Sequence, residues 1–234
     1  MLFQTHKILK KAKQEHFAIG AFNVYNLEGA LSVIQAAQEL NSPVMIQILP
    51  SALTLGDTPL VHLCLEAGKK AKIPVAIHLD HCSSKEQIHT ALDAGISSVM
   101  ADGSMLDYEN NLGFTKTIVQ LAEKTNAGVE AELGRIGGSE DGLPEEELKT
   151  KMTNPYQAVD FVKQTKISAL AVCIGNVHGK YKNIPRLDFE RLAAIEKNIS
   201  IPLVLHGASG LQDEMIEKSI ALGVCKFNVN TEIR

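Results

Sequence analysis

The runs PVMIQIL (residues 43–49) and PVAIHL (residues 74–79) decide the fold, because each is short, opens on a proline and is almost continuously apolar. Such runs are typical of strands buried on both faces, as in a parallel sheet. The same pattern recurs from end to end of the chain. The further runs are FAIGAF (17–22), SSVMA (97–101), AGVEAEL (127–133), ALAVCIG (169–175), PLVLHG (202–207) and VCKFNV (224–229).

Between these runs the apolar residues recur with helical spacing, as in residues 27–40, 85–94, 108–124 and 155–164. Eight strands joined by helices predict an α/β fold of the (β/α)8 TIM-barrel type, which typically takes about 250 residues. The alternative, an open doubly wound sheet, usually carries a glycine-rich phosphate turn after its first strand. The segment AFNVYNLEG (21–29) has no such turn, so the barrel is favoured.

The domain organisation is predicted to be simple. The 234 residues contain no linker, low-complexity tract or shift in composition, which indicates a single domain over residues 1–234. The sequence stops at Arg234, directly after the eighth predicted strand, so the helix after that strand is expected to be missing. We therefore expect a domain that is truncated at its C-terminus or belongs to a longer chain.

Composition and charge exclude several classes of protein. The chain is 45% hydrophobic and 21% charged, which argues against disordered and collagenous classes, and its formal net charge of −4 predicts no nucleic-acid or membrane partner. No apolar run approaches the roughly 18 residues of a membrane span, and lysines interrupt the N-terminal segment, which is expected to form a helix rather than a signal peptide. The absence of a CxxC pair indicates free thiols in a reducing, cytoplasmic compartment, at Cys64, Cys82, Cys173 and Cys225.

Polar side chains gather at the predicted C-terminal ends of the strands, where barrels hold their catalytic groups. His81, His178 and His206 each follow a different strand, with the carboxylates Asp102 and Glu132 at the ends of others. Three imidazoles suit Zn²⁺ and leave one coordination position open for substrate. A single histidine at a strand end is more often structural, but three at matched positions favour a metal site. By contrast, His78 lies one layer deeper in its strand and is interpreted as a buried, hydrogen-bonded core residue.

Glycine-rich segments follow three of the strands. Gly179 follows His178 directly, and HGASG (206–210) leaves backbone N–H groups free to approach a phosphate, although an ordinary tight turn is the alternative. The segment GRIGGSE (134–140) leads into an acidic stretch and predicts a long mobile loop over the site, or else a solvated insertion.

These residues together resemble the class II, zinc-dependent ketose-bisphosphate aldolases, the family of fructose- and tagatose-bisphosphate aldolases. The resemblance implies zinc-dependent aldol cleavage of a ketose 1,6-bisphosphate to dihydroxyacetone phosphate and an aldehyde, a role in carbohydrate metabolism and glycolysis, and a homo-oligomer (dimer or tetramer) in the full-length form. The matching stretches are AFNVYNLE (21–28), HLDH (78–81), SVMADGS (98–104), VEAELGRIGGSEDG (129–142), AVCIGNVHG (171–179), LVLHGASG (203–210) and KFNVNTE (226–232).

The resemblance also implies roles for individual residues. The zinc ligands would be His81, His178 and His206, with Asp102 and Glu132 at a second or alternative metal position. Asp80 matches the acid/base for the C4 hydroxyl, and Glu140 matches the glutamate that handles the C1 proton of the three-carbon half. The phosphorylated triose, with a monovalent cation (Na⁺ or K⁺), would be held by Asn23, Gly179, Gly207, Ala208, Ser209, Asn228, Val229, Asn230 and Thr231.

The sequence leaves alternatives for the catalytic route and for the substrate. Aldol cleavage can also run through a lysine Schiff base, but the sixth strand has no lysine and Lys226 lies early in the eighth, which favours the metal route.

Leu49 stands where family members often have a serine. Fructose-type enzymes typically read NIDT where this chain reads NVNT (228–231), and tagatose-type enzymes NVAT. The alternatives are a weakly active metal- or phosphate-binding barrel in a larger protein, and an aldolase for another phosphorylated or keto-acid substrate.

Overall fold

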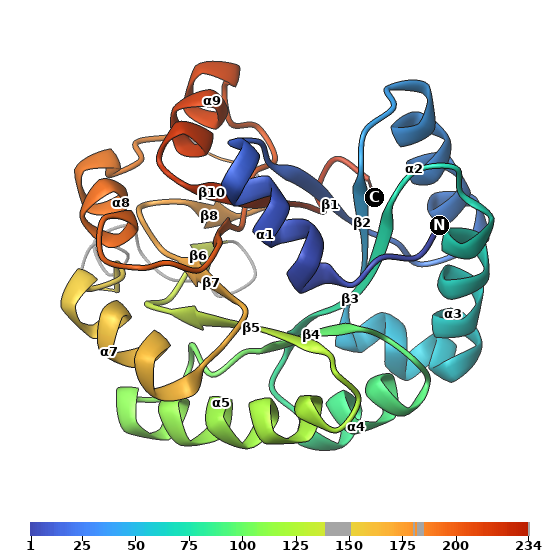
Figure 1. Ribbon diagram of the computed structural model, residues 1–234, viewed down its shortest axis with the longest axis horizontal. Helices are drawn as coiled ribbons and strands as arrows, with labels where there is room; N and C mark the ends of the chain where they lie inside the picture. The colour runs from blue at the N-terminus through green and yellow to red at the C-terminus, as the bar shows by residue number, and fades with distance from the viewer. Residues whose placement is uncertain (139–150, 180, 182–184, 234) are drawn as a thin grey trace.

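The computed structural model describes residues 1–138, 151–179, 181 and 185–233. Eight parallel strands close into a barrel in the order β1-β2-β3-β4-β5-β7-β9-β10, with β10 paired back to β1 (Figure 1). This confirms the predicted TIM barrel. The strands are β1 Ile19–Asn23, β2 Val44–Ile48, β3 Val75–Cys82, β4 Ser98–Ala101, β5 Gly128–Leu133, β7 Ala169–Val172, β9 Leu203–Leu205 and β10 Val224–Val229.

Helices surround the barrel and pack against the outer side of most of its strands (Figure 1). Most begin at a residue whose side chain accepts a hydrogen bond from the first turn, as Asn26, Ser84 and Asp107 do. The outer helices are α2 Leu27–Glu39, α3 Pro50–Lys70, α4 Lys85–Asp93, α5 Tyr108–Glu123, α7 Pro155–Thr165, α8 Phe189–Glu196 and α9 Asp213–Ala221.

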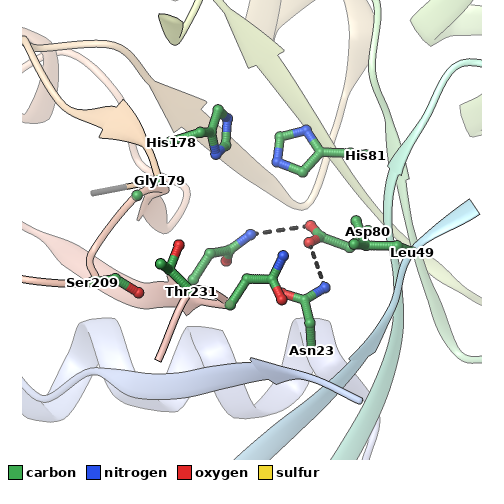
Figure 2. A pocket seen from close by; sticks show the side chains of 11 residues that line it. Asn23, Leu49, Asp80, His81, His178, Gly179, Ser209 and Thr231 are labelled. Carbon is green, nitrogen blue, oxygen red and sulfur yellow. Dashed lines mark hydrogen bonds between the residues drawn. The ribbon is translucent and has the colours of Figure 1, made fainter. Parts of the chain in front are cut away.

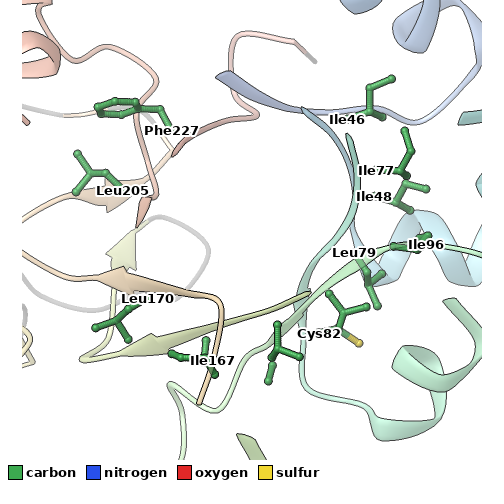
Figure 3. Close-up of a cluster of buried hydrophobic side chains, with 14 of the residues drawn as sticks. Ile46, Ile48, Ile77, Leu79, Cys82, Ile96, Ile167, Leu170, Leu205 and Phe227 are labelled. Atoms are coloured by element: carbon green, nitrogen blue, oxygen red, sulfur yellow. The ribbon is translucent and has the colours of Figure 1, made fainter. Parts of the chain in front are cut away.

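The strands are apolar on both faces because each face packs against a different core. On β2, Ile46 and Ile48 belong to the large cluster between barrel and helices, part of which Figure 3 shows, whereas Met45 points into the barrel. All five positions of β2 are therefore buried, which explains why its sequence does not alternate between apolar and polar residues.

An N-terminal helix, α1 Thr5–Glu15, closes one end of the barrel. The sequence led us to expect a helix in this segment. Its buried face, formed by Ile8, Leu9 and Ala12, packs on small and apolar residues that point into the barrel, such as Ala21 and Met45. This end of the barrel is consequently filled by apolar side chains. The polar groups described below lie toward the opposite end, at the carboxyl ends of the strands.

A second, two-stranded sheet was not predicted. β6 Gly137–Gly138, in the loop after β5, pairs in parallel with β8 Val177–His178, in the loop after β7. The pairing ties two loops together and places His178 on a short strand instead of in a free loop. The remainder of the predicted mobile loop, including Glu140, lies outside the described residues.

The chain after β10 forms a turn up to Ile233, the last described residue. An apolar groove runs along the outside of β1 and β10, with Gly20, Phe227 and Val229 among its lining residues. Among the described residues, no helix combines the length and the apolar character that crossing a membrane requires.

Candidate active site

A pocket opens at the carboxyl ends of the strands, and most of the predicted site residues meet there. Figure 2 shows His178 and Gly179 on one side of the pocket, facing His81 and Asp80 on the other. The lining residues come from the carboxyl ends of six barrel strands and from the segments that follow those ends: Asn23, Leu49, Asp80, His81, His178, Gly179, Gly207, Ser209, Asn228, Asn230 and Thr231.

The end of β3 brings two consecutive residues, Asp80 and His81, into this pocket. Neighbouring residues of a regular strand point to opposite faces of the sheet. Here the register with β4 shifts between Leu79 and Cys82, and His81 adopts a positive φ of 46°. Such a bulge redirects a side chain, at a cost in backbone strain that is common at functional sites. The local distortion therefore allows both side chains to line one cavity.

Three imidazole rings converge at the mouth of the barrel. The ring centroid of His81 lies 4.8 Å from that of His178 and 4.6 Å from that of His206. The Nδ1 atom of His206 is 2.8 Å from the Nε2 atom of His81. Burial lowers the pKa of His178 to about 4 and that of His206 well below its usual value, so both rings are neutral. Neutral imidazoles are the form that binds a metal.

The residues of this cluster fit a metal ion. One ligand atom from each of His81, His178, His206 and Glu132 can be chosen so that all four lie within 4.8 Å of one another. The Oε2 atom of Glu132 is buried and has no hydrogen-bond partner among the described residues. Burial and the nearby Asp102 raise the pKa of Glu132 to about 8. Three imidazoles and a carboxylate form a donor set that suits Zn²⁺.

Asp102 lies on the far side of His81, outside this group of four ligands. Its Oδ2 atom is 2.8 Å from Nδ1 of His81, and its Oδ1 atom accepts a hydrogen bond from the hydroxyl of Ser104 at 2.7 Å. Burial opposes the charge on His81, but the carboxylates of Asp80 and Asp102 outweigh that effect and raise the pKa of His81 to about 10. Asp102 therefore fixes the orientation of His81 and leaves Nε2 directed at the cluster.

Asp80 is held by two amides. Its Oδ2 atom accepts a hydrogen bond from Nδ2 of Asn23 and its Oδ1 atom one from Nδ2 of Asn228, both at 3.0 Å and both drawn in Figure 2. Burial acts to raise the pKa of Asp80, but the charges of His81 and Lys226 outweigh it and the pKa lies below its usual value. The pocket thus contains an oriented, ionised carboxylate beside the histidine cluster.

The glycine-rich loops lie against one another on the other side of the pocket. Gly207 has a positive φ of 64°, and a Cβ atom at this position would overlap the carbonyl oxygen of Val177. Tyr181, which the sequence did not single out, joins the loops: its hydroxyl donates to the carbonyl of Gly207 at 2.8 Å and accepts from the N–H of Val177 at 3.2 Å. Only glycine permits this close approach of the two backbones.

Two of the predicted ligand-binding residues lie elsewhere. Ala208 and Val229 line the outer groove beside β1 and β10 and are not part of the pocket. Their neighbours Gly207, Ser209, Asn228 and Asn230 do line it. Glu140 lies outside the described residues. The interpretation of His78 as a buried, hydrogen-bonded residue is confirmed, because its Nδ1 atom is 2.7 Å from the hydroxyl oxygen of Ser98.

Two charged residues lie beneath the histidines, Glu130, which the sequence did not single out, and Lys226, whose pairing it did not predict. Both are buried, and the Nζ atom of Lys226 lies 2.8 Å from Oε2 of Glu130. Glu130 precedes Glu132 by two residues on β5, so the two-residue period of a strand places both on the inner face. This two-residue spacing from Glu132 is the sequence signal that could have identified Glu130 as an inward-facing residue.

Comparison with known proteins agrees with this geometry. The family model for class II fructose-bisphosphate aldolases matches residues 3–234. The YdjI aldolase from Escherichia coli K12 is 38% identical with a TM-score of 0.88, over 99% of this chain and 83% of that one. A putative fructose-1,6-biphosphate aldolase from Coccidioides immitis is 39% identical with a TM-score of 0.90, over 97% of this chain and 81% of that one.

A more distant structure, the fructose-bisphosphate aldolase from Campylobacter jejuni, is 28% identical with a TM-score of 0.79, over 99% of this chain and 77% of that one. The family match covers nearly the whole chain and includes every strand that contributes to the pocket. The chain therefore belongs to the class II fructose-bisphosphate aldolase family and is an aldolase lyase.

Proposed function

We propose that the protein catalyses the reversible, zinc-dependent aldol cleavage of a ketose 1,6-bisphosphate of the fructose or tagatose type, giving dihydroxyacetone phosphate and an aldehyde. The observation that carries the proposal is the convergence of three imidazoles and Glu132 beside the ionised carboxylate of Asp80. This arrangement places metal ligands and a proton acceptor in one cavity, which is what cleavage next to a carbonyl requires.

The zinc would be held by Nε2 of His81, Nδ1 of His206 and the ring of His178, with Glu132 supplying a further or alternative ligand. A bound zinc ion supplies Lewis-acid polarisation of the substrate carbonyl, which stabilises the negative charge that cleavage leaves on the adjacent carbon. We assign Asp102 to the orientation of His81, because its carboxylate is bonded to the opposite ring nitrogen.

Asp80 acts in this proposal as the acid/base for the C4 hydroxyl of the substrate. In the direction of cleavage its carboxylate takes the hydroxyl proton as the bond between C3 and C4 breaks, and in the direction of condensation it returns the proton. The amides of Asn23 and Asn228 keep both carboxylate oxygens oriented. Glu140 would transfer the proton at C1 of the three-carbon half.

The phosphorylated triose would lie against the glycine-rich side of the pocket. Gly179, Gly207 and Ser209 offer backbone N–H groups, and the loops after the last strands of a barrel commonly hold phosphate. Asn228 and Thr231 complete this side, together with a monovalent cation, Na⁺ or K⁺. Negative charge on the phosphate favours such a cation beside it.

Two lining residues favour a second candidate, an aldolase for a different phosphorylated substrate. Leu49 contributes an apolar side chain to the pocket, and Asn230 contributes an amide whose Oδ1 atom accepts a hydrogen bond from the hydroxyl of Tyr25 at 2.7 Å. Neither provides a negative charge or a hydroxyl for a sugar. The rate of cleavage of fructose and tagatose 1,6-bisphosphates, compared with other phosphorylated ketoses, decides between the two candidates.

A further inference from the structure

A chain of buried charged groups lies directly behind one of the proposed zinc ligands. The Oε1 atom of Glu130 is 2.8 Å from Nε2 of His206, and its Oε2 atom is 2.8 Å from Nζ of Lys226. Glu130 is 2% exposed, and the other two side chains are fully buried. His78 lies beside the pair, with its Nε2 atom 3.8 Å from Oε2 of Glu130. His206 connects these groups to the pocket, because its Nδ1 atom lies 2.8 Å from Nε2 of His81, a residue of the pocket lining.

The bond from Glu130 determines which nitrogen of His206 is available to a ligand. A carboxylate only accepts hydrogen bonds, so the Nε2 atom of a neutral His206 must carry the proton that faces it. The lone pair is then on Nδ1, the atom that lies 2.8 Å from Nε2 of His81. The contact with Glu130 thus selects the tautomer that directs the lone pair of Nδ1 into the histidine cluster.

Lys226 holds Glu130 from across the barrel. β5 and β10 are not neighbours, because β7 and β9 lie between them in the strand order, so the ion pair spans the interior. A buried ion pair of this kind is often no more stabilising than apolar residues of similar size. A gain in stability therefore does not explain why a charged pair is buried here. The contact between Glu130 and Nε2 of His206, the nitrogen that faces away from the cluster, does explain it.

We propose that Glu130, braced by Lys226, is a positioning residue that fixes the ring and tautomer of His206 for metal binding. This inference rests on the proposed function, since it takes His206 as a metal ligand. Carboxylates bonded to the second nitrogen of a metal-binding histidine typically contribute 10- to 100-fold to metal affinity. We expect the pair Glu130–Lys226 to contribute to metal affinity by a factor in this range without contacting the substrate.

The test uses the double variant Glu130→Gln/Lys226→Met, which removes both charges with little change in volume. The dissociation constant for Zn²⁺ is measured by competition with a chromophoric chelator, and the melting temperature of the metal-free protein is measured in parallel. We expect zinc affinity to fall by about 10- to 100-fold, with the melting temperature close to that of the wild type. The matched control, Lys13→Met/Glu196→Gln, removes an ion pair of 3.5 Å far from the pocket and should leave zinc affinity unchanged.

A second variant covers the case in which the double variant does not fold. Glu130→Asp retains the charge beside Lys226 but withdraws the carboxylate from His206 by one methylene, and about a tenfold loss of zinc affinity is expected. Wild-type affinity in a folded form of either variant overturns the positioning role and leaves the proposed function intact. The proposed ligand set itself fails if the wild type binds no zinc, or binds it no better than His206→Ala does.

Discussion

The Nδ1 atom of His206 lies 2.8 Å from the Nε2 atom of His81, although 125 residues separate the two in the sequence. Each ring is held from behind by a carboxylate, His81 by Asp102 and His206 by Glu130. The two nitrogens that face each other are therefore the two that no carboxylate occupies. This arrangement shows how strand ends that are far apart in the sequence bring nitrogen atoms together in a group that could hold a metal ion.

Removing one of the converging imidazoles should remove the metal. In His206→Ala, zinc remaining after dialysis is expected to fall to about one-tenth of the wild-type content or less, because the site loses one of three nitrogen ligands. The measurement is metal analysis of the purified protein. His89→Ala is the matched control, since His89 is an exposed residue of α4 paired with Asp93. Zinc retained in full by His206→Ala would contradict the ligand assignment.

Replacing the proposed acid/base should separate catalysis from metal binding. Asp80→Asn conserves the size of the side chain but removes the proton acceptor, so kcat is expected to fall by about 10²- to 10⁴-fold. Zinc content should stay near that of the wild type, because Asp80 is not among the four clustered ligands. Steady-state kinetics and metal analysis on the same preparation check both. A kcat close to the wild-type value would show that another group transfers the proton.

The backbone of Gly207 lies so close to that of Val177 that a side chain at position 207 should be destabilising. In Gly207→Ala, the new Cβ would overlap the carbonyl oxygen of Val177, and the positive φ of 64° disfavours alanine. We expect the free energy of unfolding to fall by about 1–3 kcal/mol, and KM for a phosphorylated substrate to rise because the loop must shift. In the control Gly113→Ala, on α5, the added methyl group meets nothing within 4 Å. That variant should be stabilised by about 0.5–1 kcal/mol, as denaturant unfolding can measure.

The four cysteines should be unreactive in the folded protein. Burial raises the pKa of Cys64 to about 12 and the pKa of Cys173 and Cys225 to about 11, and it also raises the pKa of Cys82. At pH 8 these thiols are protonated, whereas the thiolate is the reactive form. Ellman's reagent is expected to detect no thiol in the native protein and all four thiols after denaturation. Fast reaction of any thiol in the native protein would show that its surroundings are open to solvent.

Local sequence pattern was sufficient to predict most of the fold and the convergence of three histidines at one end of the barrel. The apolar runs correspond to the barrel strands because both faces of each strand are buried, and the predicted run at 224–229 coincides with β10. The three histidines could be identified because strand ends meet at one mouth of a barrel. The N-terminal helix was also predicted, because lysines interrupt this segment and argue against a signal peptide.

What the sequence did not reveal depends on contacts between distant segments. The strands β6 and β8 have two residues each and carry no apolar period, so their pairing was not predictable. The bond between Asp102 and His81, and the pair of Glu130 and Lys226, require knowledge of which side chains meet inside the barrel. The outward position of Ala208 and Val229 likewise follows from loop geometry that the sequence does not encode locally.

The measurement that tests the central claim most directly combines metal content with aldol cleavage, on protein purified with and without a chelator. Fructose and tagatose 1,6-bisphosphates are offered together with other phosphorylated ketoses. We predict stoichiometric zinc, cleavage of at least one ketose bisphosphate, loss of cleavage with chelator and its return when zinc is added back. Cleavage that persists in metal-free protein, or a protein that binds no metal at the histidine cluster, would contradict the account.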